Sequence, residues 1–356
     1  MKSLLIVPLT LLLFLLEAGL AMPSRADSHG QKAVLVTGAT SGIGRSTAEL
    51  LAKQGYFVYA GARKDADMAK LNKIENTLAV RLDVTNQEQI DAAVARIEKE
   101  GRGLWGVVNN AGVNVVAPLV AAREDEFQFL FNVNVFGVHR VTKAFAPLVV
   151  ASKGRIVNVS SISGILSGPN YGMYSASKHA LEAMTDALAS EMEPFGVHVS
   201  AVNPGNFASE IGLTRCKRRI ANADTDDWGL WEDLRQSLLK SCGERLKDGI
   251  AGEGTPPTAV AETISRALFE ESPRLRYMVV PEQFEAGLTI SAGMIELLLF
   301  NGGHEHSYTR EEMRALVDLA WPYGTGEKAM ISDSQFESFM EDLGPWLERK
   351  EAAGAD

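Results

Sequence analysis

The sequence predicts an α/β fold, a doubly wound parallel sheet of seven strands, on two observations. Short runs rich in β-branched residues alternate with segments of helical spacing, the order typical of strand–helix–strand units. Glycines and polar side chains follow the ends of most of these runs, where open parallel sheets bind their ligands. The expected strands cover residues 32–37, 57–61, 78–82, 105–108, 154–159, 197–202 and 276–280.

Composition and charge limit the kinds of protein that this chain can be. Of its 356 residues, 46% are apolar and 22% are charged, the balance of a globular protein with a sizeable core. The net charge of −10 argues against a nucleic-acid partner, which favours a basic face. Cys216 and Cys242 lie in no metal-like spacing, so we expect two free thiols, with a disulfide in an oxidising compartment as the alternative.

The N-terminal segment, residues 1–22, predicts a secretory signal peptide. Lys2 precedes an apolar run of thirteen residues, 4–16, interrupted only by Thr10, and Gly19 and Ala21 provide a small-residue cleavage pattern. Taken through to residue 22 the run is nineteen residues long with one interior glutamate, so a membrane anchor is the alternative. A polar linker, residues 23–30, is expected before the domain that begins at residue 31.

The first strand leads into a glycine-rich turn, Gly38 to Gly44, and then into a helix over residues 45–54. A strand, a glycine turn and a helix together place a pyrophosphate on backbone N–H groups at the positive end of the helix. The spacing of the glycines is GxxxGxG. A tight turn that needs glycine for steric reasons is the alternative.

The second strand ends at Ala62, Arg63 and Lys64. In dinucleotide-binding sheets an acid at this place suits the ribose of NAD, and an arginine suits the 2′-phosphate of NADP. Ala62 is not acidic and the next two residues are cationic, which favours NADP(H), with NAD(H) as the second choice. Two solvated loop charges are the alternative.

Polar residues also follow the third and fourth strands. Asp83 and Val84 follow the third, with a capping box expected at Thr85 and Glu88 for the next helix. The fourth leads into Asn109-Asn110-Ala111-Gly112. Residues 123–150 have helical spacing with Asn134 inside, and an isolated asparagine there indicates only a local backbone hydrogen bond.

The fifth strand is followed by Ser161, and the next helix holds Tyr174 and Lys178 before a sixth strand exits at Pro204 and Gly205. Residues four apart lie on one face of a helix. An ammonium beside a phenol favours the phenolate and so lowers the pKa of the tyrosine towards neutral pH. An ordinary helix surface is the alternative for this pair taken by itself.

These motifs resemble those of the short-chain dehydrogenase/reductase family, motif by motif over residues 32–205 and less closely to about residue 281. The matching residues are Thr37-Gly38-Ala39-Thr40-Ser41-Gly42-Ile43-Gly44, Asn109-Asn110-Ala111-Gly112, Asn134, Ser161 and the Tyr174–Lys178 pair. Residues 157–164 and 203–207 are similar to the branch of retinol, hydroxysteroid and 3-hydroxybutyrate dehydrogenases. The family's threonine after Pro-Gly is missing, and Ser209 is the candidate replacement.

The resemblance implies a Rossmann-like fold and a role for each catalytic residue. Tyr174 exchanges a proton with the substrate oxygen, and Lys178 lowers the pKa of Tyr174 and holds the nicotinamide ribose. Ser161 hydrogen-bonds the substrate oxygen. Asn134 positions water in a proton relay. The residues expected at the cofactor are Thr37, Gly38, Ser41, Gly42, Ile43, Gly44, Arg63, Asp83, Val84, Asn110, Ala111, Gly112, Tyr174, Lys178, Pro204 and Gly205, and no metal is expected.

Two segments lie beyond these motifs. Residues 206–255 (the lid) carry apolar side chains such as Trp228 and are expected to form a helical lid over the substrate, with core packing as the alternative. Residues 284–300 are an apolar helix at the end of the oxidoreductase domain, 31–300. Core packing is its default, with a dimer contact or a membrane surface as alternatives. Residues 301–356 are expected to form a helical C-terminal appendage.

Together these features predict an NAD(P)-dependent alcohol dehydrogenase or carbonyl reductase for a lipophilic secondary alcohol or ketone, steroid-, retinoid- or hydroxyacyl-like. The alternative is a non-catalytic nucleotide-binding scaffold of the same fold. The family resemblance implies a homo-oligomer. The N-terminal segment predicts membrane association or the secretory pathway or periplasm, with a catalytic domain facing the cytoplasm as a further arrangement.

Overall fold

A computed structural model of the chain describes residues 30–248, 254–325 and 339–348. The predicted signal peptide or anchor, residues 1–22, lies outside the described residues, as does the linker up to residue 29. Among the described helices, one is long and apolar enough to cross a membrane by length and composition, α10 (Gln283–Asn301), and only 6% of its apolar window is buried.

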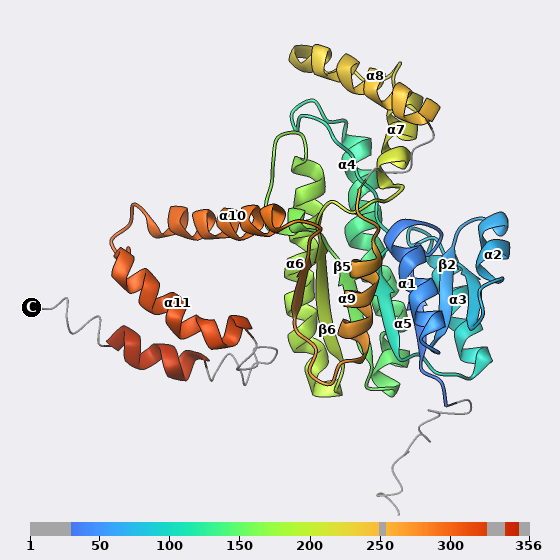
Figure 1. Cartoon of the computed structure of the whole chain (residues 1–356), viewed down its shortest axis with the longest axis horizontal. Coiled ribbons are helices and arrows are strands. Elements are labelled where there is room, and N and C mark those ends of the chain that lie inside the picture. The colour runs from blue at the N-terminus through green and yellow to red at the C-terminus, as the bar shows by residue number, and fades with distance from the viewer. Residues whose placement is uncertain (1–29, 249–253, 326–338, 349–356) are drawn as a thin grey trace, which may run out of the picture.

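The described strands form one parallel sheet of seven strands in the order β3-β2-β1-β4-β5-β6-β7, which confirms the predicted fold (Figure 1). The strands are β1 (Ala33–Val36), β2 (Phe57–Ala62), β3 (Thr77–Arg81), β4 (Gly106–Asn109), β5 (Arg155–Val159), β6 (His198–Pro204) and β7 (Arg276–Val279). In the middle of the sheet, Leu35 lies beside Tyr59 on one side and Val107 on the other. The order reverses at β1, so the carboxyl ends of β1 and β4 open the crevice in which such sheets bind ligands.

Helices cover both faces of the sheet, so its central strands are buried on both sides and mostly apolar. Successive strand residues point to opposite faces. Leu35 packs in a cluster with Phe145 from α5 (Gly137–Ala151), together with residues of α3 (Gln87–Glu100) and α6 (Gly172–Met192). Val34 packs on the other face with Leu51 from α1 (Gly42–Lys53) and Ile264 from α9 (Thr258–Phe269).

Two local predictions are changed by the structure. The predicted capping box at Thr85 and Glu88 is wrong: the N-cap of α3 is Asn86, whose side chain accepts a hydrogen bond from the backbone N–H of Gln89. Thr85 binds the carboxylate of Asp83 instead. The single helix expected over residues 123–150 is three segments: α4 (Glu124–Phe131), a π-helical turn (Asn132–Phe136) and α5.

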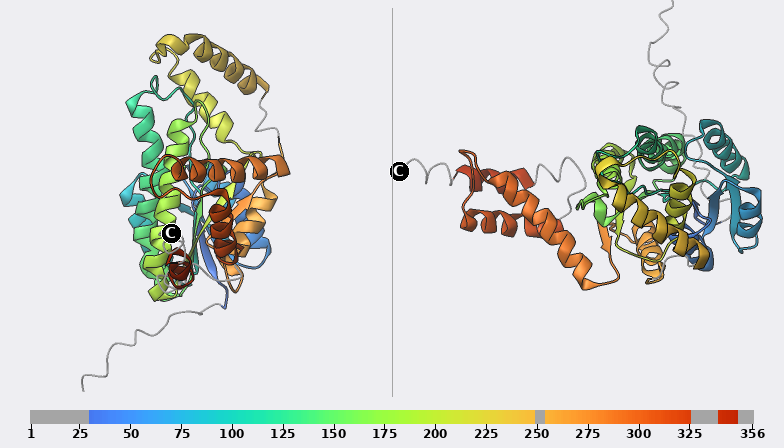
Figure 2. Two further views of the ribbon diagram at one scale, coloured as in Figure 1. Left: turned by 90° about the vertical axis from the view of Figure 1, so that its left-hand side faces the viewer. Right: turned by 90° about the horizontal axis from the view of Figure 1, so that it is seen from above.

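Two segments after β6, the lid and the chain from α10 onward, lie away from the sheet (Figures 1 and 2). The lid contains α7 (Ile211–Ala221) and α8 (Glu232–Asp248), which lie beyond the carboxyl ends of the strands. Helix α10 extends outward, followed by α11 (Arg310–Thr325) and by a helical stretch at residues 339–348. This last stretch packs on α11 through Tyr323 and Phe339, whose rings meet edge to face at 5.3 Å. The remaining short elements are α2 (Asp65–Leu71) and the 3-10 turns Ile162–Gly164, Glu193–Phe195 and Gly229–Trp231.

Candidate active site

The glycine-rich turn between β1 and α1 has the backbone that the sequence predicted for a pyrophosphate site. Gly38 and Gly42 have φ angles of +64° and +52°, which only glycine adopts without strain. A side chain at Gly44 would collide with the Asn110 amide and the Gly38 carbonyl. Helix α1 begins at Gly42, and the N-cap residue Ser41 makes no side-chain capping bond. The turn therefore presents backbone N–H groups at a helix N-terminus, an anion site that fits a dinucleotide.

Three of the predicted cofactor residues brace this turn from beneath. The buried Thr37 hydroxyl accepts hydrogen bonds from the backbone N–H groups of Asn110 and Ala111, at 2.9 and 3.0 Å. The Asn110 side chain donates to the carbonyls of Thr37 and Gly38, at 2.9 and 3.2 Å. These contacts tie the end of β1 to the end of β4. The predicted Ile43 packs against the core beside the turn.

The predicted adenosine end lies at the ends of β2 and β3. Arg63 is two-thirds exposed, with Nη1 3.8 Å from the carboxylate of Asp83. The other Asp83 oxygen accepts hydrogen bonds from the backbone and hydroxyl of Thr85. Val84 is buried against Gly137, where an added side chain would collide with it. Arg63 is therefore an accessible cation at this end of the crevice, and the neighbouring Lys64 is exposed as well.

Asn134 is buried in the π-helical turn, where its side chain joins two parts of the site. Its Oδ1 accepts from the backbone N–H of Val113, and its Nδ2 donates to the Val113 carbonyl, both at 2.9 Å. The same amide donates to the Ser177 hydroxyl of α6 at 3.1 Å. π-helical turns are common at functional sites because they redirect one side chain. Asn134 thus links the segment after β4 to the helix that carries the tyrosine.

Ser161, Tyr174 and Lys178 come together at the carboxyl ends of β5 and β6. The Ser161 hydroxyl lies within hydrogen-bond reach of the partly buried Tyr174. Lys178 is buried, with Nζ 2.9 Å from the Val159 carbonyl and 5.8 Å from the centroid of the Tyr174 ring. A side chain added at Gly112 would lie 4.0 Å from Lys178 Nζ and 3.5 Å from Asn134 Oδ1, so all four predicted catalytic residues face one region.

Burial dominates the electrostatics of the pair. It raises the pKa of Tyr174 above its ordinary value, and the hydrogen bond with Ser161 opposes this only in part. Burial also lowers the pKa of Lys178 to about 8, against the opposing effect of Glu182. The lowered pKa of Tyr174 that the sequence predicted is therefore not found, because Lys178 donates to a backbone carbonyl and burial penalises the phenolate.

Glu182 is a site residue that sequence reasoning missed. It lies one turn after Lys178 on the same helix, and it accepts hydrogen bonds from the Asn203 amide at 2.6 Å and from Arg276 at 3.0 Å. Asn203 in turn donates to the Ser161 carbonyl. The i, i+4 spacing from Lys178 was the available signal. The carboxylate holds the end of β6 and the start of β7 at the helix that carries Tyr174 and Lys178.

The predicted residues after β6 have mixed placements. Pro204 ends β6, and its carbonyl lies 3.5 Å from the Ser161 hydroxyl. A side chain at Gly205 would collide with Glu285 of α10, which binds the backbone and side chain of Asn206. Ser209, the candidate replacement for the family's threonine, packs over Gly42 in the glycine turn, where an added Cβ would lie 3.3 Å from it.

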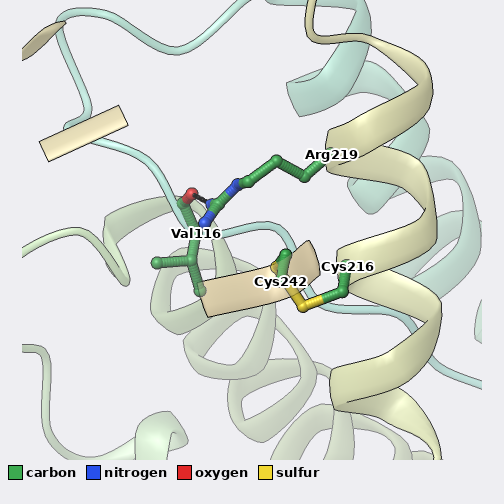
Figure 3. Close-up of a disulfide and its surroundings, with 4 residues drawn as sticks. All are labelled: Val116, Cys216, Arg219 and Cys242. Carbon is green, nitrogen blue, oxygen red and sulfur yellow. Dashed lines mark hydrogen bonds between the residues drawn. A yellow bond between two sulfur atoms is a disulfide. The ribbon is translucent and has the colours of Figure 1, made fainter. Parts of the chain in front are cut away.

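The two cysteines correct one prediction. Cys216 of α7 and Cys242 of α8 form a disulfide, so the expected free thiols are wrong (Figure 3). Their separation of 26 residues matches no motif, and packing of α7 against α8 brings them together. Below these helices, Trp228 is buried in a cluster with Met173 and the partly buried Tyr174. The lid therefore has apolar side chains on its side towards Tyr174.

Comparisons with known proteins show the family to which the chain belongs. The family model "short chain dehydrogenase" matches residues 32–218. The chain is 33% identical over 272 residues to the mitochondrial D-beta-hydroxybutyrate dehydrogenase of Mus musculus, with 71% of this chain and 78% of the relative covered. It is 34% identical over 249 residues to the 3-ketodihydrosphingosine reductase of Bacteroides thetaiotaomicron, with 70% and 87% covered.

A solved structure is similar as well. The short chain dehydrogenase/reductase from Burkholderia phymatum in complex with NAD is 25% identical, with a TM-score of 0.63 and coverage of 75% of this chain and 95% of that one. The predicted resemblance to the branch that includes hydroxybutyrate dehydrogenases is confirmed. The family model spans more than half of the chain. This chain belongs to the short-chain dehydrogenase/reductase family of oxidoreductases.

Proposed function

We propose that this oxidoreductase interconverts a lipophilic secondary alcohol and the corresponding ketone, with a nicotinamide dinucleotide as the second substrate. The observation that carries the proposal is the meeting of Ser161, Tyr174 and Lys178 at the carboxyl end of the sheet, beside a glycine turn that fits a pyrophosphate. The dinucleotide, when bound, supplies or accepts hydride. The protein supplies orientation and proton handling.

Each side chain has a distinct task in this proposal. Ser161 donates a hydrogen bond to the substrate oxygen and stabilises the negative charge that develops there during reduction. Tyr174 gives its phenolic proton to the same oxygen, and its raised pKa favours the protonated form needed for this step. Lys178, with a pKa of about 8, is poised to replace that proton near neutral pH. Asn134 holds the segment at Val113 that closes this part of the site.

The lipophilic substrate class is supported by the side chains next to Tyr174. Met173 is fully buried and Trp228 nearly so, and Leu234 and Leu238 of α8 pack on the same cluster. The names of two relatives reported above, a 3-ketodihydrosphingosine reductase and a hydroxybutyrate dehydrogenase, refer to compounds with a keto group and a hydroxyl group. We therefore propose steroid-, retinoid- or hydroxyacyl-like compounds as the first substrates to examine.

The test compares Tyr174→Phe with Tyr171→Phe across a panel of such alcohols and ketones. Loss of the Tyr174 hydroxyl removes the proton donor, so we expect kcat to fall by roughly 10²- to 10⁴-fold in nicotinamide absorbance assays. Tyr171 is exposed and has no lysine four residues later, so its variant should retain activity. Full turnover by Tyr174→Phe would contradict the mechanism. Cofactor binding without turnover of any compound would support the scaffold alternative.

We further propose that NADP(H) is preferred to NAD(H). Arg63 extends from the end of β2 with its side chain accessible, and Ala62 provides no acid for the ribose hydroxyls. In cofactor titrations Arg63→Ala should weaken the binding of NADPH about tenfold, equivalent to about 1.4 kcal/mol, and change the affinity for NADH by less than about twofold. Lys73→Ala, an exposed lysine beyond α2, is the charge-matched control. Equal affinity of the wild type for both cofactors would contradict the preference.

The disulfide supports the location that the N-terminal sequence predicted. Disulfides persist in secreted, lumenal and periplasmic proteins and are rare where thiols are kept reduced. We therefore propose that the catalytic domain lies in an oxidising compartment. Alkylation of intact cells before lysis should leave Cys216 and Cys242 unmodified, whereas labelling of both without added reductant would place the domain in a reducing compartment.

A further inference from the structure

A small cavity lies between the lid and the segment that follows β4. Its volume is about 30 Å³, room for roughly two water molecules or one carboxylate group. Val116, Met173 and Trp228 line it from three sides, and α7 closes it with Arg215 and Arg219. Met173 precedes Tyr174 in α6 and packs in the same apolar cluster. Ser161, Tyr174 and Lys178 do not line the cavity, which reaches the proposed reaction centre through the cluster that Met173 and Trp228 share with Tyr174.

Neighbouring arginines of α7 differ in their partners. The Nε atom of Arg218 donates to both carboxylate oxygens of Glu126, at 2.9 and 2.7 Å. Arg219 is only 8% exposed, and its guanidinium donates to the Val116 carbonyl (Figure 3). Within residues 30–248, 254–325 and 339–348, Arg219 forms no ion pair. A buried cation without a paired anion is costly, and burial accordingly lowers the pKa of Arg219 to about 10.

Arg215 repeats this pattern one turn earlier. Its Nε atom is buried and has no hydrogen-bond partner in the described part of the chain. Residues i and i+4 share a helix face, so both side chains line the same cavity. Cys216 lies between them, and its disulfide to Cys242 ties this helix to α8 (Figure 3). The cross-link holds in place the helix that carries both cations.

The charge balance of the lining also favours an anion. Four arginines and two carboxylates line the cavity, a net charge of +2 in a protein whose overall charge is −10. Both carboxylates already have cationic partners. Glu126 is bound by Arg218, and Asp226 lies 3.3 Å from Arg123. The charge without a carboxylate partner is therefore that of Arg215 and Arg219.

We propose that Arg219, assisted by Arg215, binds a carboxylate of the substrate, so that this enzyme acts on apolar hydroxy or oxo acids. This inference rests on the proposed function, because it places the carboxylate in the cavity while the reacting carbon lies at Tyr174. A guanidinium fits a planar carboxylate with two parallel hydrogen bonds, which a neutral ester or amide cannot match. The buried Trp228 ring lies 5.4 Å from the Arg219 guanidinium, where it would shield the guanidinium and the bound carboxylate from water.

The direct test is binding of octanoate and of octanamide to the disulfide-intact, NADP⁺-saturated full chain, measured by calorimetry. We expect octanoate to bind at least tenfold more tightly than octanamide. Arg219→Gln should abolish this difference and leave the affinity for octanamide within about twofold of the wild-type value. Lys217→Gln removes the same charge from an exposed position of α7 and should preserve the difference. Equal affinity of the wild type for octanoate and octanamide would overturn the inference. An equal loss of octanoate affinity in Arg219→Gln and Lys217→Gln would overturn it as well.

A kinetic measurement separates this inference from the proposed function. With 3-oxooctanoate, Arg219→Gln should raise KM at least tenfold and change kcat by less than about threefold, and Arg219→Lys should recover part of the loss. With the methyl ester of 3-oxooctanoate, Arg219→Gln should have the same KM and kcat as the wild type. Turnover of the ester and the acid with the same KM by wild-type enzyme would refute the carboxylate site and leave the Tyr174 mechanism intact. Loss of all turnover in Tyr174→Phe, with octanoate binding retained, would support both.

Discussion

The central sheet and helix α10 contain similar apolar side chains in opposite surroundings. Leu35 and Ile156 in the sheet are 0% and 1% exposed. In α10 the large apolar side chains after Glu285 are 50% to 80% exposed. They occur around most of the helix circumference, at Leu288, Ile290, Met294, Ile295, Leu297, Leu298, Leu299 and Phe300. A helix that is apolar all round is normally buried in a large core or a membrane.

The difference shows that similar composition does not imply a similar role in stability. The sheet obtains its partners from helices of the same chain, on both faces. Helix α10 is held through its first turns, by Glu285 at Asn206 and by the buried Thr289, while the rest extends from the body (Figure 2). The core packing expected by default for residues 284–300 is therefore not found. Burial of the remaining surface requires something other than the described chain.

The largest effect expected from this comparison is in stability. Leu35→Ala should lower the free energy of unfolding by about 2–5 kcal/mol, because it leaves a cavity in a closely packed core. Leu299→Ala, the same change in an exposed side chain, should alter it by less than about 0.5 kcal/mol. Urea denaturation of the purified variants measures both. A loss above about 2 kcal/mol for Leu299→Ala would show that α10 is buried in solution.

The lid should respond separately from the sheet. Replacing Cys216 and Cys242 by serine removes a cross-link over 26 residues, and we expect α7 and α8 to lose about 2–4 kcal/mol of protection against local opening. Hydrogen exchange followed by mass spectrometry resolves the two helices from the strands. Amides of β1, β4 and β5 should exchange as in the wild type. Faster exchange across the whole sheet would mean that the lid and the sheet unfold as one unit.

The smallest effect concerns Lys178, which is buried at the proposed site. The pKa of Lys178 falls from 10.5 to about 8 on folding, so between these values the unfolded chain binds more protons and stability rises with pH. The free energy of unfolding of the wild type should therefore rise relative to that of Lys178→Met, by up to about 1.4 kcal/mol per pH unit between pH 8 and 10. Unfolding curves at several pH values give this difference. Parallel pH profiles would show that Lys178 keeps its ordinary pKa.

Much of the fold and the placement of the site could be read from sequence because local and global patterns agree. The centres of the runs at 32–37 and 105–108 are apolar, as expected for strands buried on both faces, and they form β1 and β4. Gly38 and Gly42 marked a turn that requires positive φ. Tyr174 and Lys178 were found through helical spacing, and Ser161 and Asn134 through family motifs, all short-range signals.

The other features depend on contacts between distant segments. The packing of α7 pairs Cys216 with Cys242 and Arg218 with Glu126, and it leaves Arg219 without a carboxylate partner in the described residues. No local pattern encodes these contacts. The pKa of Tyr174 likewise reversed its expected direction because burial, a sum over many neighbours, outweighed the one nearby lysine. The sequence by itself determined the sheet, its glycine turn and the Tyr174–Lys178 spacing from which the catalytic pair is proposed. Only the tertiary structure decided the charge environment of that pair and which arginines of α7 lack a carboxylate partner, since both depend on long-range packing.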